Sequence, residues 1–435
     1  MASSWTASSR TASSRTGTAA RPDTGWYPVA RSAQVGTTPL PVGAGGRAWV
    51  VLRVRPGAEV TALPARCPHR LVPLAHATVV DGRVRCPFHG WRYDAEGRCV
   101  DIPSLGPAGT PPPRADLSGP WAVEERDGWV WLAPERTAAV RPPRSSGVVP
   151  TPEPVPPLPT PAGPVLGNLD PSLEHAWHPV ALAGELHEGG YVQTRLLGRT
   201  WTVHRRGGAP AADPPVWGVA ERHGVVWIAP AEPRDTQLPV PETSDPRAVR
   251  AWLPPVRSSA PAGPLTDLFL DAAHVPVVHP AADAPDDPVA DVVPETGGST
   301  SVREERSARD GTRRRTTAVH RAPFQLRVRT DELDTGAART VLYLLQPEDD
   351  DSTRVYACLF LTPPEGAALS SDEVATEVAG VGAVLAADLE LAAVLGSVGL
   401  PLLPRDELHV PADAPGVALR RTLADFAALP LRRSA

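Results

Sequence analysis

Two short pairs of cysteine and histidine are the residues of this chain best suited to bind iron. The first pair is Cys67-x-His69, and after residues 70–85 comes the second, Cys86-x-x-His89. Two thiolates and two imidazoles are the ligand set of a [2Fe–2S] cluster in which histidines replace cysteines on one iron. A zinc site from the same four residues is the alternative, but zinc sites usually use CxxC and HxxxH spacings. The spacing therefore predicts an iron–sulfur cluster, with each pair on its own loop.

A second group of potential ligands follows the pattern Asp267-x3-Asp271-x2-His274-x4-His279. On a continuous helix Asp267, Asp271 and His274 share one face. Pro276 lies between the two histidines, and we expect it to break or kink the helix so that His279 reaches the same metal. Two histidines and one carboxylate form the facial triad of non-haem Fe(II) oxygenases. The alternative is that both histidines are merely solvated or packed.

The carboxylate that completes this site is expected much later in the chain. Residues 370–398 open with the capping-box pattern Ser370-x-x-Glu373 and continue as a helix. Asp388 shares its helix face with bulky apolar residues, whereas Glu390 lies among alanines. An acid on a core-facing stripe is costly to bury unless it is paired or bound to metal. We therefore predict Asp388 as the third iron ligand, with Glu390 as the alternative. Asp388 could also face a wet crevice.

The chain also contains an internal repeat. Its paired segments are WYPVA at 26–30 with WHPVA at 177–181, RAWVVLR at 47–53 with RTWTVHR at 199–205, and WAVEERDGWVWLAP at 121–134 with WGVAERHGVVWIAP at 217–230. The second copy lacks the interval that holds all four cluster ligands in the first copy, and it contains no cysteine. Its alternating apolar residues and turn glycines fit short antiparallel strands. We predict a second β unit without a cluster, although chance similarity between Trp-rich strands is an alternative.

These features divide the chain into five parts. Residues 1–20 are predicted to be a disordered tail, 21–135 the cluster domain, 136–170 a Pro-rich linker, 171–235 the cluster-less unit and 236–435 the catalytic domain. In the last part, strands are expected around 292–306, 314–330 and 338–362, packed on the long helix. The predicted fold class is α+β.

Composition and charge indicate the cellular compartment and argue against some kinds of partner. The four cysteines in 435 residues leave no disulfide framework once two bind iron, which favours a reducing cytoplasm. Cys99 is expected to be a packed thiol. A net charge of −6 argues against a nucleic-acid partner. The most apolar stretch, Val378–Leu403, carries Asp388 and Glu390 at its centre, so we expect a buried helix and no membrane span.

The run CPFHGWRYDAEGRCVDIPS at 86–104 resembles the Rieske-type non-haem iron oxygenases, and the monooxygenase and demethylase branch in particular. Respiratory Rieske proteins carry an extra disulfide between the two loops, and this chain has Leu71, Val72 and Phe88 at the matching places. The resemblance covers roughly residues 21–135 and 250–400. It implies an all-β Rieske domain and an α+β catalytic domain of the helix-grip type, with the third iron ligand on a late helix.

The resemblance also implies a function: a terminal oxygenase component that passes electrons from the cluster to a mononuclear Fe(II). That iron would activate O₂ to hydroxylate or demethylate an apolar organic substrate. The chain has no strand-linked GxGxxG motif, so a separate reductase, with or without a ferredoxin, is expected to supply electrons from NAD(P)H. The alternative is a Rieske electron-transfer protein whose C-terminal domain binds a ligand or partner without oxygen chemistry. In a third interpretation the cluster-less unit is a docking module.

Two further expectations follow from the same resemblance. Asp271 should hydrogen-bond both the cluster ligand His89 and the iron ligand His274, while Asp267 stands where many relatives carry asparagine. Two carboxylates one turn apart repel or share a proton. Related oxygenases form trimers in which each cluster serves a neighbouring subunit. A chain with a second, empty unit could instead use its cluster for its own iron.

Overall fold

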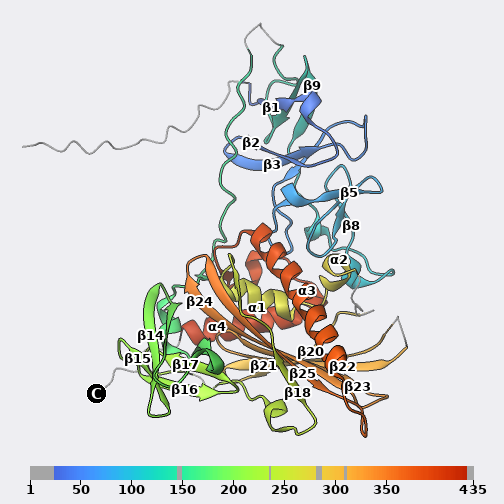
Figure 1. The fold of residues 1–435 in the computed structure, drawn as a ribbon. Coiled ribbons are helices and arrows are strands. Elements are labelled where there is room, and N and C mark those ends of the chain that lie inside the picture. The colour runs from blue at the N-terminus through green and yellow to red at the C-terminus, as the bar shows by residue number, and fades with distance from the viewer. Residues whose placement is uncertain (1–23, 145–148, 235–236, 281–286, 308–310, 429–435) are drawn as a thin grey trace, which may run out of the picture.

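The computed structural model describes residues 24–144, 149–234, 237–280, 287–307 and 311–428. The tail predicted at residues 1–20 lies outside these ranges. Figure 1 shows three regions: an elongated N-terminal β region in blue and cyan, a central region with a large sheet and the helices, and a smaller β region in green.

The N-terminal region consists of three small antiparallel sheets, with strand orders β1-β10-β9, β2-β3-β4 and β5-β6-β7-β8. One cysteine–histidine loop joins the second sheet to the third, and the other joins β6 to β7 within the third sheet. The strands are β1 Tyr27–Arg31, β2 Leu40–Ala44, β3 Arg47–Leu52, β4 Thr61–Pro64, β5 Thr78–Val80, β6 Arg83–Arg85, β7 Arg92–Tyr93, β8 Cys99–Asp101, β9 Ala122–Arg126 and β10 Trp129–Ala133.

The green region, which we call the second β unit (residues 178–229), contains two three-stranded sheets. Their orders, β12-β17-β16 and β13-β14-β15, follow the chain in the same way as β1-β10-β9 and β2-β3-β4. Nothing in this unit corresponds to β5–β8, because β15 is followed directly by β16. The strands are β12 His178–Leu182, β13 Tyr191–Leu196, β14 Arg199–Arg206, β15 Ala209–Asp213, β16 Gly218–Arg222 and β17 Val225–Ala229.

Local details repeat as well as strand order. The pairing of β1 with β10 shifts register between Pro28 and Ala30, and that of β12 with β17 shifts between Pro179 and Ala181. The indole N–H of Trp49 donates to a backbone carbonyl five residues earlier at 3.2 Å, and that of Trp201 does the same at 3.3 Å. The repeated sequence segments thus occupy equivalent places in two similar β units.

The central region is built on an eight-stranded antiparallel sheet of order β18-β25-β24-β23-β22-β21-β20, with β19 also pairing with β25. Each of the three predicted strand regions contains a hairpin of two strands. The strands are β18 Val249–Trp252, β19 Val256–Ser258, β20 Asp291–Glu295, β21 Gly298–Arg306, β22 Arg313–Arg321, β23 Gln325–Glu332, β24 Ala338–Asp349 and β25 Ser352–Thr362.

The two faces of this sheet pack against different partners, because successive side chains of a strand point to opposite faces. Tyr343 and Leu359 belong to a core shared with the helices. Leu344 and Phe360 belong to a separate core that includes Trp227 of the second β unit. The second β unit therefore covers the face of the sheet opposite to the helices.

Four helices lie on the other face: α1 Ala262–Leu270, α2 Val275–Val278, α3 Ser371–Leu395 and α4 Ala414–Ala428. Helix α3 begins with the predicted capping box, in which Ser370 and Glu373 exchange side-chain to backbone hydrogen bonds. Within the described residues α3 alone is long and apolar enough to cross a membrane by length and composition. Its face around Asp388 is packed inside the protein.

The predicted single helix through Asp267, Asp271 and His274 is wrong. Helix α1 ends at Leu270, and Asp271 has extended backbone angles. The Asp271 carboxylate accepts a hydrogen bond from the Ala273 N–H at 2.7 Å, a local bond that competes with helix continuation. Pro276 does not break a helix either, since it stands in the first turn of α2, where proline is tolerated.

The Pro-rich connection is attached at both of its ends. Glu153 forms a β-bridge with Gly43 of the N-terminal region. At the other end, strand β11 (Val165–Leu166) pairs with β26 (Leu400–Pro401) of the central region. The connection therefore follows a defined path from one region to the other in the part that the structure describes.

Candidate metal centres

The four predicted cluster residues lie together at the end of the N-terminal region. Cys67 and His69 are on the loop between β4 and β5, and Cys86 and His89 are on the loop between β6 and β7. Each is at most 3% exposed, and the two imidazole rings have centroids 4.3 Å apart. The two thiols are within hydrogen-bonding reach of each other. The two loops thus bring two thiols and two imidazoles together in one buried site.

The surroundings of these residues suit a bound anionic cluster. Burial alone would raise the pKa of the Cys67 thiol, but hydrogen bonds from Cys86 and Tyr93 and from backbone N–H groups lower it. The Tyr93 hydroxyl is 3.2 Å from the Cys67 sulfur. Donors aimed at sulfur stabilise thiolates and tune clusters. The Nδ1 atom of His69 is buried and has no hydrogen-bond partner within the described residues, so it is free to bind metal.

His274, His279 and Asp388 form a second group, with one ligand atom from each lying within 4.8 Å of the others. The two histidines flank α2, as its N-cap and C-cap, and Asp388 comes from the middle of α3. Asp388 Oδ1 is 2.7 Å from His279 Nε2 and 3.3 Å from His274 Nε2. All three side chains are buried.

Burial distinguishes the two candidate carboxylates of α3, Asp388 and Glu390. Asp388 is 4% exposed and lies on the helix face of Val381, Leu385 and Leu391, whereas Glu390 faces solvent. The His274 ring is buried, and its Nε2 atom lies near Asp388 Oδ1 at 3.3 Å. Two imidazoles and one carboxylate gathered in this way fit the donor set of a mononuclear iron site.

Asp271 lies between the cluster residues and the candidate iron site, beside His89 and His274. Its Oδ2 forms a short hydrogen bond with Nε2 of the cluster residue His89. Burial alone would raise the pKa of Asp271, but the His89 contact and the nearby His274 lower it. The hydrogen bond between Asp271 and the His274 ring involves the Asp271 backbone and not its carboxylate. Phe88 also approaches that ring, with centroids 6.0 Å apart.

Asp413 was not predicted and contacts the other cluster histidine. Both of its oxygens lie 2.9 Å from His69 Nε2, and Oδ2 also accepts the Val410 N–H at 2.7 Å. Asp413 is separated from His69 by 344 positions and belongs to no recognisable motif. A sequence signal was therefore not available, apart from its place directly before helix α4.

Asp413 also belongs to a buried group of charges that we call the ion cluster: Arg70, Asp267, Glu407, Asp413 and Arg420. Arg420 makes two hydrogen bonds of 2.9 Å to Asp267 and lies 2.7 Å from Glu407. Burial alone would raise the pKa of Asp267, but Arg420 and Arg70 lower it. The expected repulsion between Asp267 and Asp271 is present, but the two arginines outweigh its effect on the pKa of Asp267.

Comparison with protein families gives the N-terminal region its identity. The model of the Rieske [2Fe-2S] domain matches residues 25–112, which include all four cluster residues. These residues form a Rieske [2Fe–2S] domain. The matched range lies within the N-terminal region, and the second β unit lies outside it.

Curated relatives resemble part of the chain. It is 43% identical over 70 residues to Protein TIC 55 of Arabidopsis thaliana, covering 16% of this chain and 13% of that protein. It is 36% identical over 110 residues to aminopyrrolnitrin oxygenase PrnD of Pseudomonas fluorescens, covering 25% and 30%. The chain thus spans well under half of these relatives' length.

NdmA of Pseudomonas putida CBB5, a QL mutant with caffeine, aligns over 92% of this chain and 90% of its own at 17% identity, with a TM-score of 0.40. The curated relatives that the chain resembles over part of its length thus include a named oxygenase.

A surface cavity of about 330 Å³ lies between β20 and α4. Its lining includes Val292, His409, Val410 and Arg421, and none of the three residues of the candidate iron site. It does not correspond to the apolar substrate pocket expected beside the iron.

Proposed function

We propose that this chain is the terminal oxygenase component of a Rieske non-haem iron oxygenase, of the monooxygenase type. The observation that supports this proposal most strongly is the convergence of His274, His279 and Asp388, with His274 next to Phe88 of the second Rieske loop. A Rieske domain that only carried electrons would have no need of three buried ligand residues gathered next to it.

In this proposal Cys67, Cys86, His69 and His89 hold a [2Fe–2S] cluster. His274, His279 and Asp388 hold a mononuclear Fe(II). When bound, these groups would supply single electrons and a place for O₂ activation, respectively.

The side chains around these ligands would position them. Asp271 accepts the His89 Nε2–H, which fixes the tautomer of that ring and leaves its other nitrogen for the metal. Asp413 does the same for His69. Burial of His274, His279 and Asp388 keeps bulk water away from the proposed iron site. In this way the protein would hold both groups in place before substrate arrives.

Partners and substrate follow from the same proposal. A separate reductase, with or without a ferredoxin, would supply electrons from NAD(P)H. The substrate would be an apolar organic small molecule that is hydroxylated or demethylated. We place the protein in the cytoplasm as a soluble enzyme, without a membrane span. It would have the five parts described above, with residues 236–435 as the catalytic domain, and a trimer is the oligomeric state that the resemblance implies.

We further propose that residues 171–235 are a degenerate Rieske-like unit that has lost its cluster loops. The equal strand order, the equal register shifts and the equivalent Trp49 and Trp201 hydrogen bonds support this origin. The packing of Trp227 on the catalytic sheet supports a structural role for the unit.

Iron and sulfide analysis of the anaerobically purified chain tests the proposed activity. We expect about three iron atoms and about two sulfides per chain, together with the electron paramagnetic resonance signal of a reduced Rieske cluster. In His274→Ala the iron content should fall to about two while the Rieske signal persists. About two irons in the wild-type chain after Fe(II) reconstitution would instead support the electron-transfer alternative.

A further inference from the structure

The surface cavity between β20 and α4 is distinct from both candidate metal centres, since its lining includes none of their residues. The lining comes from β20, from residues 409–411 and from α4, and no residue of the Rieske domain takes part in it. Its volume of about 330 Å³ is at the lower end of the range of about 300–1,000 Å³ that small-molecule sites occupy. A molecule with one ring or a short chain therefore fits a site that belongs wholly to the central region.

The walls of this cavity are mainly apolar. Strand β20 contributes Val292 and Pro294, while Val410, Val417 and Ala418 come from helix α4 and the segment before it. Val292, Pro294 and Val417 remain partly or fully exposed to solvent. A ligand with an apolar body would remove these surfaces from water, which is favourable.

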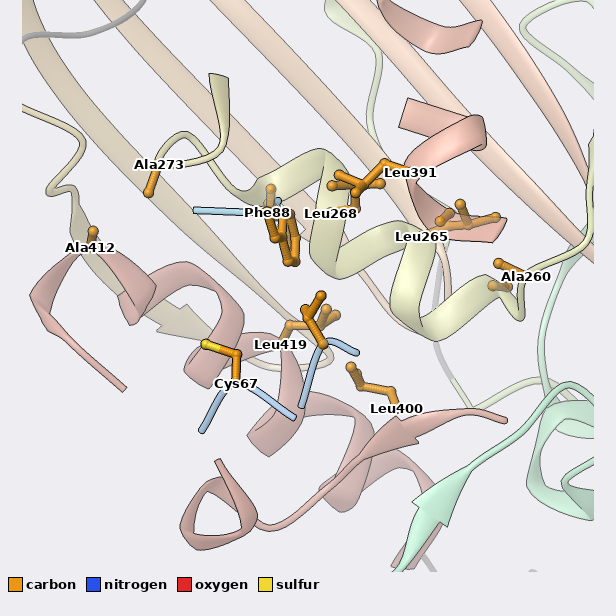
Figure 2. Close-up of a cluster of buried hydrophobic side chains, with 14 of the residues drawn as sticks. Cys67, Phe88, Ala260, Leu265, Leu268, Ala273, Leu391, Leu400, Ala412 and Leu419 are labelled. Carbon is orange, nitrogen blue, oxygen red and sulfur yellow. The ribbon is translucent and has the colours of Figure 1, made fainter. Parts of the chain in front are cut away.

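Helix α4 has one face in the core and another at the cavity. Figure 2 shows Leu419 of α4 among buried side chains that include Leu268 and Leu400. Arg421 comes two positions after Leu419, about 200° around the helix, and lines the cavity. The same helix thus presents an apolar side chain to the core and a charged one to the cavity.

The Arg421 guanidinium is available to a ligand. It is exposed, and it has no hydrogen bond or ion pair within the described residues. The preceding residue differs, because Arg420 is buried and bound to Asp267 and Glu407. A guanidinium presents a planar set of N–H donors that matches a carboxylate in two parallel hydrogen bonds. Charge complementarity at a mainly apolar cavity therefore favours a ligand with one carboxylate.

His409 is the other polar residue of the described lining. Both of its ring nitrogens are buried and have no hydrogen-bond partner within the described residues, which is uncommon for buried polar atoms. The Glu407 carboxylate lies 3.9 Å from Nε2, too far for a hydrogen bond. Burial and the arginines of the ion cluster lower the pKa of His409 to about 4, so the ring is neutral near pH 7 and keeps one N–H to donate. Rotation about the broad terminal torsion of the side chain would direct that N–H toward the cavity.

We infer that this cavity binds a small apolar carboxylate. The carboxylate would pair with the Arg421 guanidinium and accept the His409 N–H, and the apolar body would lie against Val292 and Val417. Such a ligand would contact no residue of the candidate iron site, so it would be an effector and not the molecule that is oxidised. The inference therefore does not rest on the proposed function.

Benzoate is the probe that tests this inference, with benzamide as a neutral counterpart of nearly the same shape. Isothermal titration calorimetry of the full chain measures the binding of each, and thermal unfolding checks that each variant is folded. The wild-type chain should bind benzoate saturably and benzamide about 10-fold more weakly, because the amide cannot form an ion pair with Arg421. Neither measurement requires O₂ or mononuclear iron.

Three variants locate the binding. In Arg421→Gln the affinity for benzoate should fall about 10-fold, while the affinity for benzamide changes less than about twofold. Arg405→Gln removes another exposed arginine that does not line the cavity, so this control should bind both probes like the wild type. Val417→Phe keeps both polar residues but fills part of the cavity, so it should weaken the binding of both probes.

Equal affinity for benzoate in the wild type, Arg421→Gln and Val417→Phe would overturn the inference, because benzoate would then bind elsewhere. Absence of saturable benzoate binding to the wild type at about 10 mM would overturn it as well. Equal binding of benzamide and benzoate to the wild type would show that the cavity does not select a carboxylate.

Discussion

At the scale of single residues, the proposed metal sites have carboxylates behind or beside imidazoles. Asp271 and Asp413 each bond the Nε2 atom of a cluster histidine, and Asp388 faces the Nε2 atoms of His274 and His279. A carboxylate behind a ligating histidine fixes its tautomer and raises its basicity, while a carboxylate beside two histidines is itself a metal ligand.

We predict that Asp388→Asn loses the mononuclear iron and that Glu390→Gln keeps it. Both changes remove one negative charge from α3, but Asp388 is buried beside the histidines and Glu390 faces solvent. Changes behind a metal ligand already cost about 10- to 100-fold in affinity, and loss of a ligand should cost at least as much. The measurement is Fe(II) affinity of the cluster-loaded chain. Equal affinity in both variants would show that Asp388 is not a ligand.

The sequence was informative about residues wherever a local pattern carried the signal. The two cysteine–histidine pairs, the two histidines of 267–279 and the core-facing position of Asp388 are all visible in short windows. Asp413 was missed because its role depends on a contact with His69 across 344 positions. The balance of charge at Asp267 was missed for the same reason, since Arg420 is 153 positions away.

At the scale of elements, the site depends on where the helices end. The capping box of α3 was predicted correctly because it is a local pattern. The end of α1 was not predicted, because the Asp271 carboxylate bonds the Ala273 N–H and thereby replaces a helical turn by a local one. That early end lets the Asp271 carboxylate reach His89.

Helix α4 gives the prediction at this scale. A Cβ on Gly416 would lie 2.5 Å from Asp267 Oδ1 and 2.8 Å from Arg70 Nη2, whereas Gly380 of α3 has nothing within 4 Å. We predict that Gly416→Ala lowers the free energy of unfolding by about 1–3 kcal/mol, because the ion cluster must shift. Gly380→Ala should raise it by up to about 1 kcal/mol, through helix propensity. Denaturant unfolding measures both, and a neutral Gly416→Ala would mean that the ion cluster is loosely packed.

At the scale of the whole molecule, one sheet separates two β units of similar construction. The Rieske domain docks at the helices on one face, and the second β unit packs on the opposite face. Repeated sequence segments indicated that two such units exist, because each repeat carries its own Trp-rich strands. The sequence did not predict that the two units pack on opposite faces of the sheet. That packing depends on which side chains of β24 and β25 contact each region.

This arrangement predicts that the second β unit contributes to the stability of the central sheet and not to the proposed iron site. Trp227 is 1% exposed and packs with Leu344 and Phe360 of the sheet, while Trp217 of the same unit is 56% exposed. We predict that Trp227→Ala lowers the free energy of unfolding by about 3–5 kcal/mol, the usual cost of removing a buried tryptophan. Trp217→Ala, the matched control, should cost at most about 1 kcal/mol, mainly through its contact with Trp177.

The metal content of the same two variants separates a structural role from a functional one. Because the second β unit lies across the sheet from His274, His279 and Asp388, both variants should keep the iron content and the Rieske spectrum of the wild-type chain at temperatures where they are folded. Loss of mononuclear iron in folded Trp227→Ala would contradict this, since it would mean that the second β unit fixes the sheet geometry on which α3 places Asp388.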